Sequence, residues 1–205
     1  MQKRLLPLLS LLLVIWGCGE AGFQSDVSKG IEIDPINVSF SVPALLVNQT
    51  INVAALPQSQ QDELTTSEQT DLIEISTDDF DDYISDAEKF TVNEITYRID
   101  GFPTGSRADL ELSISVTLEG SQATFDLIDT TIEDVQTKTT DVQLYPGTGV
   151  NASGIAQLET ALKDRSGFYL NIEVRVAGSD VVLTSEDVDF DIIFGFDVTA
   201  RLQLD

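Results

Sequence analysis

The stretch VDFDIIFGFDVTARLQL, residues 188–204, decides the fold of this chain. Every even position in it is apolar, and the odd positions are polar apart from Ile193 and Gly195. A period of two indicates a β-strand with one buried face and one face in water. Seventeen residues would span about 55 Å, far more than a usual strand. We therefore expect a bend or bulge near Gly195 that carries the strand on into a second sheet.

Similar alternation recurs along the chain between turn signals, and it predicts further strands. The predicted strands are Ile36–Val42, Leu45–Val53, Asp71–Ser76, Phe90–Ile99, Leu110–Leu118, Ala123–Ile128, Thr131–Val135, Phe168–Val176 and Val181–Thr184. Short helices are predicted at Thr77–Ala87 and Gly154–Arg165, and a long loop at Leu56–Thr70. Sheets with one wet face are typically antiparallel and bury their apolar faces against each other. The sequence predicts an all-β, mainly antiparallel β-sandwich of roughly eight to ten strands with one or two short helices; a partly closed barrel is the alternative.

The chain is acidic, with 35 Asp and Glu against 11 Lys and Arg and a formal net charge of -24 in 205 residues. Such a charge repels nucleic acid and anionic lipid surfaces, so no nucleic-acid partner is expected. It suits solubility, or the binding of cations or basic partners. The apolar content of 42% argues against wholesale disorder.

The amino terminus has the features of a targeting segment. Lys3 and Arg4 precede an apolar run over Leu5–Ile15, which is too short for a stable membrane span. The run ends in Ile15-Trp16-Gly17-Cys18, and Cys18 is the only cysteine in the chain. This motif resembles the lipobox of bacterial lipoproteins, although Trp16 departs from the usual small or aliphatic residue.

The resemblance implies that Cys18 becomes the first mature residue and carries acyl chains, of which two or three give stable membrane anchoring. Gly19 is not the aspartate associated with inner-membrane retention, so an outer-membrane destination is favoured. We therefore expect a signal peptide at 1–17, a flexible tether at 18–30 and a single β-sandwich domain at 31–205. After lipidation the chain has no free thiol.

The residues needed for common catalytic sites are missing from the sequence. It contains no histidine, which excludes Ser-His-Asp triads and His-ligated metal sites. No Gly-rich phosphate loop is present. A mature chain would also lack the single Trp16, leaving Tyr83, Tyr97, Tyr145 and Tyr169 for sugar stacking. We therefore expect a protein that is not an enzyme and needs no cofactor, with calcium as the one open question.

Two groups of carboxylates are candidate calcium ligands, since Ca²⁺ takes six to eight oxygen atoms. The first group includes Asp78, Asp79 and Asp82, which equally suit the wet face of a short helix. The second is Asp187, Asp189 and Asp191, spaced two apart on the wet face of the last strand. Their like charges repel unless a cation lies among them, but exposed charge also discourages sheets from aggregating at their edges.

Two further features bear on function. Asp129-Thr130-Thr131 resembles an O-glycosylation sequon of Bacteroidetes, which makes Thr130 a candidate for modification. Phe190, Phe194 and Phe196 would suit either a packed core or an apolar cavity. The sequence thus predicts a lipid-anchored cell-envelope protein with a binding, adhesion or structural role towards an envelope protein or glycan. The alternative is a carrier of an apolar ligand such as a lipid.

Overall fold

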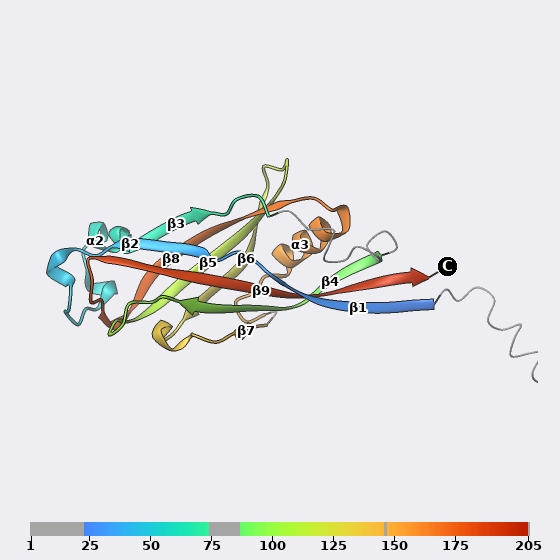
Figure 1. Ribbon diagram of the computed structural model, residues 1–205. Coiled ribbons are helices and arrows are strands. Elements are labelled where there is room, and N and C mark those ends of the chain that lie inside the picture. The colour runs from blue at the N-terminus through green and yellow to red at the C-terminus, as the bar shows by residue number, and fades with distance from the viewer. Residues whose placement is uncertain (1–22, 74–86, 146, 205) are drawn as a thin grey trace, which may run out of the picture.

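The computed structural model describes residues 23–73, 87–145 and 147–204, which form two antiparallel sheets packed face to face (Figure 1). The strands are β1 (Phe23–Glu32), β2 (Ile36–Ser41), β3 (Thr65–Gln69), β4 (Ala87–Asp100), β5 (Arg107–Leu118), β6 (Thr124–Ile132), β7 (Val142–Leu144), β8 (Phe168–Val182) and β9 (Asp187–Leu204). The predicted β-sandwich is confirmed, with nine strands in the described part of the chain.

The stretch at residues 188–204 is the centre of the first sheet. As strand β9 it pairs on one side with β4, which in turn pairs with β7. On its other side β9 pairs with two strands in succession: β2 along Asp187–Ile192 and β1 along Gly195–Leu204. The chain therefore runs along the whole length of β9, interrupted only at residues 33–35, where Pro35 cannot donate to the ladder.

The second sheet has the order β3-β8-β5-β6, and the first, without β1, has the order β2-β9-β4-β7. From β2 onwards, consecutive strands cross from one sheet to the other at every step except between β5 and β6, which are neighbours in one sheet. This strand order is that of a jelly roll, in which two sheets of four strands enclose one core. Strand β1 is an addition to it.

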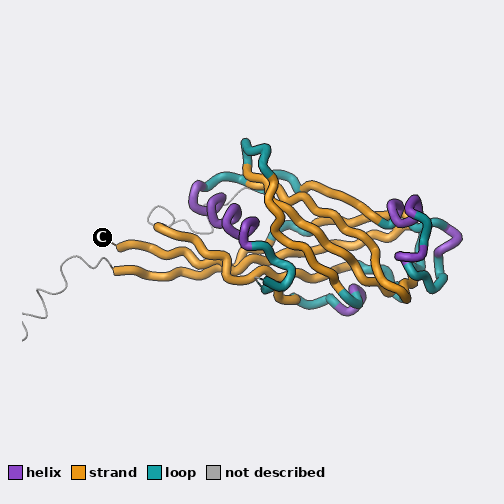
Figure 2. The backbone as a smooth tube through the Cα atoms, turned by 180° about the vertical axis from the view of Figure 1, so that it is seen from behind, coloured by secondary structure: helices purple, strands orange, loops and turns teal. Residues whose placement is uncertain are grey.

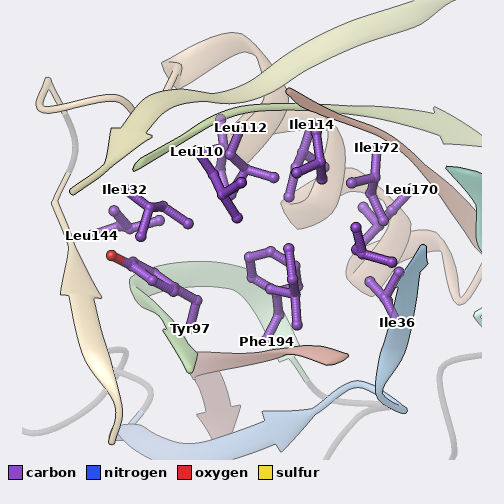
Figure 3. Close-up of a cluster of buried hydrophobic side chains, with 14 of the residues drawn as sticks. Ile36, Tyr97, Leu110, Leu112, Ile114, Ile132, Leu144, Leu170, Ile172 and Phe194 are labelled. Carbon is purple, nitrogen blue, oxygen red and sulfur yellow. The ribbon is translucent and has the colours of Figure 1, made fainter. Parts of the chain in front are cut away.

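The core lies between the two sheets, as Figure 3 shows for side chains that converge from both of them. The even residues Val188–Leu202 of β9 that were predicted to be buried are all inside it. Facing them from the second sheet are buried apolar side chains of β5, β6 and β8, including Leu110, Leu112, Ile132, Leu170 and Ile172. The alternation in the sequence thus identified the buried face correctly.

The expected bend at Gly195 is wrong, because β9 continues straight through it as a single strand of 18 residues. Gly195 lacks a side chain for another reason: a Cβ there would lie 2.6 Å from the Thr96 hydroxyl on β4. The irregularity lies in β4, where the register shifts between Val92 and Glu94. This bulge moves the buried positions of β4 from even residues, such as Val92, to odd residues, such as Ile95.

The expected flexible tether is also wrong over residues 23–30, which belong to β1 and pair in register with β9. Together with the C-terminal part of β9 and the start of β4, β1 forms a three-stranded ribbon that projects beyond the second sheet (Figures 1 and 2). Its small polar residues were misleading because Ser25, Asp26 and Ser28 are exposed on this projecting strand. Within the ribbon, Ser28 bonds to Thr199 and Arg201 to Asp26.

Several other predicted boundaries differ from the structure. The expected strand at 45–53 is instead two 3₁₀ turns, η1 (Ala44–Leu46) and η2 (Val53–Ala55). The expected loop at 56–70 contains helix α2 (Gln58–Glu63) and strand β3. The two short strands at 123–135 are one strand, β6, with a bulge that buries both Leu127 and Ile128. Strand β8 extends through the turn that was expected near Gly178. A strand was also expected at 71–76, and in its described residues there is a single β-bridge, between Ile73 and Phe168.

The predicted helix at 154–165 is confirmed as α3 (Ala152–Asp164). Its apolar face, with Leu158, Ala161 and Leu162, is buried against β4 and β6. The helix is ended by Arg165, which has a left-handed conformation with φ at 53°. The sequence suggested Gly167, two residues later, for this role. The other predicted helix, at 77–87, lies almost wholly outside the described residues.

Candidate functional site

The three carboxylates at the start of β9 lie in a row on the outer face of the first sheet. Asp187 and Asp189 are exposed, and Asp191 is half-buried. Opposite them on β2 stand the short polar residues Ser41, Ser39 and Asn37, and on β4 Asp100 lies opposite Asp191. The sequence was therefore right to place these carboxylates together on the wet face.

The side-chain amide of Asn37 lies between the carboxylates of Asp189 and Asp191. The Asn37 Nδ2 donates to Asp189 Oδ1 at 2.5 Å and to Asp191 Oδ1 at 3.3 Å. These bonds supply partial positive charge where the sequence suggested a cation. In the described part of the chain no three His, Cys, Asp or Glu side chains are arranged to hold a metal ion. The other calcium candidates, Asp78, Asp79 and Asp82, lie outside the described residues.

The outer face of the second sheet carries a shallow polar hollow of about 590 Å³. The residues that line it include Ser67, Ser113, Ser115 and Asn171, the isoleucines Ile114, Ile128 and Ile172, and four carboxylates. The carboxylates are Glu68, Asp126, Asp129 and Glu173. A second hollow of about 410 Å³ adjoins it and shares Ser113, Asp129 and Glu173.

Side chains across this hollow are bonded to one another and so hold fixed positions. Gln69 donates to Asn171 Oδ1 at 2.7 Å, and Asn171 donates to Thr117 Oγ1 at 3.1 Å. In the adjoining second hollow Arg175 pairs with Glu111 at 3.2 Å. Hydroxyl, amide and carboxylate groups on a fixed sheet can exchange hydrogen bonds with a polar, hydroxyl-rich ligand. Sequence reasoning missed this surface because β3, which forms one side of it, has no alternating apolar pattern.

A third hollow, of about 330 Å³, lies on the outer face of the first sheet where Gly30 and Gly195 leave space between neighbouring strands. Next to it Arg98 bonds to Glu32 at 3.0 Å and to Asp141 at 3.2 Å. The bonds to Glu32 and then Asp141 raise the pKa of the Arg98 guanidinium. Arg98 thus ties β1 and the segment before β7 to β4 on this face.

The structure places Thr130 on the inner side of β6. It lies opposite the buried Leu112, is half-buried, and packs so closely on Gly149 that a Cβ there would lie 2.8 Å from the Thr130 Cβ. The neighbouring Thr131 is exposed. Glycosylation of Thr130 stays a prediction.

The three phenylalanines of β9 lie in the core. Phe190, Phe194 and Phe196 are 2%, 1% and 6% exposed. The Phe190 ring makes edge contacts with Phe40 and Phe102 at centroid distances of 6.3 and 5.3 Å. These contacts agree with the simpler interpretation, that the rings fill a packed core.

Cys18 precedes the described residues, and the first of them, Phe23, already belongs to β1. The part of the chain that the structure describes contains no helix with the length and apolarity needed to cross a membrane. Figure 1 shows the start of β1 beside the C-terminus, at the end of the molecule opposite η1, η2 and α2.

Comparison with known proteins leaves the family open. No protein-family model matches the sequence, and no curated protein matches it. Among solved structures, a chain from Desmodium yellow mottle tymovirus matches at a TM-score of 0.31 and 6% identity, covering 89% of this chain and 90% of its own. A capsid protein of BFDV matches at 0.31 and 8%, covering 90% and 96%. Likeness at this level supports no inference about this protein.

Proposed function

We propose that this protein is a lipid-anchored component of a bacterial cell envelope that displays a rigid β-sandwich for a binding, adhesion or structural role. The observation that carries the proposal is the Gly17-Cys18 motif after a charged and apolar leader. The pairing of β1 begins at Phe23, five positions after Cys18, so the motif lies close in sequence to the folded domain. With Gly19 after the cysteine, we favour the outer membrane.

The start of β1 limits how far the domain can lie from its anchor. Cys18 and Phe23 are five positions apart, and five residues reach at most about 18 Å. From there β9, with 18 residues, runs about 60 Å through the ribbon and the sandwich. An acylated Cys18 would therefore place the ribbon at the bilayer and the turns η1 and η2 far from it.

The partner in this proposal is an envelope protein or a glycan rather than a substrate for chemistry. The acidic surface disfavours nucleic acid and anionic lipid. The polar hollow on the second sheet offers hydroxyl, amide and carboxylate groups suited to a hydroxyl-rich glycan. The sequence has no histidine to serve as a general base, in keeping with a role that is not enzymatic.

Metabolic labelling with a fatty-acid analogue tests the anchor. We expect label in the wild-type protein and none in Cys18→Ala, whose unprocessed leader would also keep its mass larger. Mass spectrometry of the mature N-terminus should find acyl groups on Cys18. Equal labelling of the two proteins, or a mature N-terminus at another residue, would overturn the proposal.

A further inference from the structure

Most edges of the two sheets are guarded against pairing with another strand. Short strands, prolines and bulges are the usual guards of a sheet edge. Strands β3 and β7 have five and three residues, and β2 has six residues between Pro35 and Pro43. The start of β4 has two register shifts. The outer edge of β6 is bonded to the loop before α3, where the Asp129 N–H donates to Gly149 O at 2.8 Å.

Strand β1 lacks all three guards. It runs for ten residues without a proline or a register shift, and in the described part of the chain it pairs with no strand other than β9. It belongs to the ribbon that projects beyond the second sheet, so that sheet does not cover its edge (Figures 1 and 2). The edge of β1 is therefore open to a further strand.

The pairing with β9 determines which backbone groups of β1 face this open edge. The Ile33 N–H donates to Phe194 O, directly opposite, at 2.9 Å. Bonded and non-bonded positions alternate along an antiparallel pair of strands. The odd residues of β1 therefore bond to β9, and the even residues direct their N–H and C=O groups to the open edge. These outward-facing residues are Gln24, Asp26, Ser28, Gly30 and Glu32.

The charges of β1 are balanced within the molecule, although the whole chain has a formal charge of -24. Asp26 pairs with Arg201 at 3.1 Å, and Glu32 pairs with Arg98 at 3.0 Å. The third charged residue of β1 is the cation Lys29. A second acidic copy of the chain can therefore approach this edge with less repulsion than it meets at the carboxylates of β9.

We infer that the open edge of β1 pairs with β1 of a second copy of this chain, antiparallel and about a two-fold axis at Ser28. In this register Ser28 of one copy faces Ser28 of the other, Asp26 faces Gly30 and Gln24 faces Glu32. No like charges stand opposite each other. The outward-facing residues form five pairs, and each pair exchanges two hydrogen bonds, which gives about ten bonds in all.

The neighbouring registers are less favourable. An axis at Val27 leaves four bonded pairs instead of five. An axis at Lys29 places the two lysines opposite each other and Asp26 opposite Glu32, and like charges in these positions destabilise a sheet. The sequence of β1 thus favours one register of self-pairing.

A second copy suits this edge better than a flexible peptide does. Its β1 is already an ordered strand of the same length, so that pairing does not require the ordering of a free chain. The half-buried Val27 and Ile31 would also lose further contact with water beside the added strand. The first sheets of the two copies would then form one continuous sheet across the axis.

We expect this dimer to be weak. Nine residues from each copy pair, fewer than the roughly 20–30 that each partner gives to a standard interface. The Kd should be of micromolar order or weaker, and salt should lower it by screening the charge of the two bodies. The inference does not rest on the proposed function. If the anchor holds too, the two Cys18 residues lie at opposite ends of the joined strands, so a pair would lie along the bilayer and only a single molecule would stand on it.

Sedimentation equilibrium of residues 18–205 with Cys18→Ser tests the pairing without the lipid. From about 5 to 500 µM in 0.5 M NaCl, this protein should pass from monomer to dimer. Ser28→Pro removes an N–H that β9 does not use, and should raise the Kd at least about 10-fold because both central bonds are lost. Ser39→Pro makes the same change at an outward N–H of β2 and should dimerise like the parent. Urea midpoints check that both variants fold.

A cysteine at the axis tests the register directly, and does so even if Ser28→Pro fails to fold. In the Cys18→Ser background, Ser28→Cys should form a disulfide-linked dimer under mild oxidation, since bonded positions lie about 5.5 Å apart between Cα atoms. Gly30→Cys is the control, because the two cysteines would lie four residues apart along the strands, about 13 Å.

Three results would overturn the inference. The first is a parent protein that stays monomeric up to 500 µM. The second is a dimer that Ser28→Pro and Ser39→Pro affect equally, which would place the contact on another surface. The third is a Gly30→Cys protein that cross-links as readily as Ser28→Cys, which would exclude this register.

Discussion

Gly154, in the first turn of α3, sits where the helix touches strand β6. An added Cβ would lie 2.5 Å from the Leu127 Cα, 2.6 Å from the Asp126 carbonyl oxygen and 2.9 Å from the Leu127 Cβ. Carbon atoms in contact are normally about 3.5–4.0 Å apart. These neighbours are backbone atoms or fixed to the backbone, so no rotamer change relieves the overlap. Gly154→Ala therefore forces the helix away from the sheet.

Two effects of opposite sign determine the result. Alanine is favoured over glycine in a helix by about 1 kcal/mol, so propensity alone predicts that the variant is more stable. Against it, overpacking costs about 1–3 kcal/mol. A retreat of about 1 Å would also weaken the contacts of Leu158, Ala161 and Leu162, which are at most 5% exposed. We expect the overpacking against β6 to outweigh the gain in helix propensity, with a net loss of about 2 kcal/mol in the free energy of unfolding.

Urea denaturation followed by far-UV circular dichroism measures this loss, since a mature chain has no tryptophan. With a slope of about 2–3 kcal/mol/M, the midpoint should fall by about 1 M. Ala156→Gly is the matched control, because Ala156 is exposed on the same helix and reports propensity alone, about 1 kcal/mol. A Gly154→Ala protein as stable as the wild type, or more so, would refute the close packing of α3 on β6.

Two further predictions concern charge. Asn37→Asp replaces the amide between Asp189 and Asp191 by a third carboxylate and should lower the free energy of unfolding by about 1 kcal/mol at low salt. Adding 0.5 M NaCl or calcium should restore part of this loss. An unchanged melting temperature would show that Asn37 does not stabilise the carboxylates of β9. Burial raises the pKa of Tyr97 above its usual 10. Above about pH 10 the unfolded chain loses this proton while the folded chain retains it, so stability falls as pH rises. Tyr97→Phe should flatten that alkaline loss in pH-dependent melting, and an identical slope in both proteins would contradict it.

The apolar alternation predicted which residues are buried, but not which strands pair. Strand β9 shows this best, because its even positions all lie in the core although the sheet on either side of it was not foreseeable. Strand β3 is the opposite case. Thr65–Gln69 has no apolar pattern, and its strand conformation comes from pairing with β8, about 100 residues later in the chain. Pairing over that distance leaves no local trace in the sequence.

The surfaces were harder to predict than the core for a related reason. The carboxylates of β9 suggested a cation, because the sequence does not show that Asn37 lies opposite them. The polar hollow needs β3, β8, β5 and β6 side by side. Residues 45–53 were predicted to form a strand because they include the apolar residues Leu46, Ile51 and Val53. These side chains are buried, but they fix the 3₁₀ turns to the core and do not form a strand.

The pairing of β1 with β9 determines whether the anchor can orient the domain. A flexible tether over residues 18–30 would have an average reach of about 20 Å and would leave the sandwich free to tumble above a membrane. With residues 23–32 in register on β9, at most five positions separate Cys18 from paired backbone. Arg98 and Arg201 reinforce that pairing through Glu32 and Asp26. A molecule anchored at Cys18 would then stand with β9 leading away from the bilayer, because β9 pairs with β1 at one end and continues to β2 at the other.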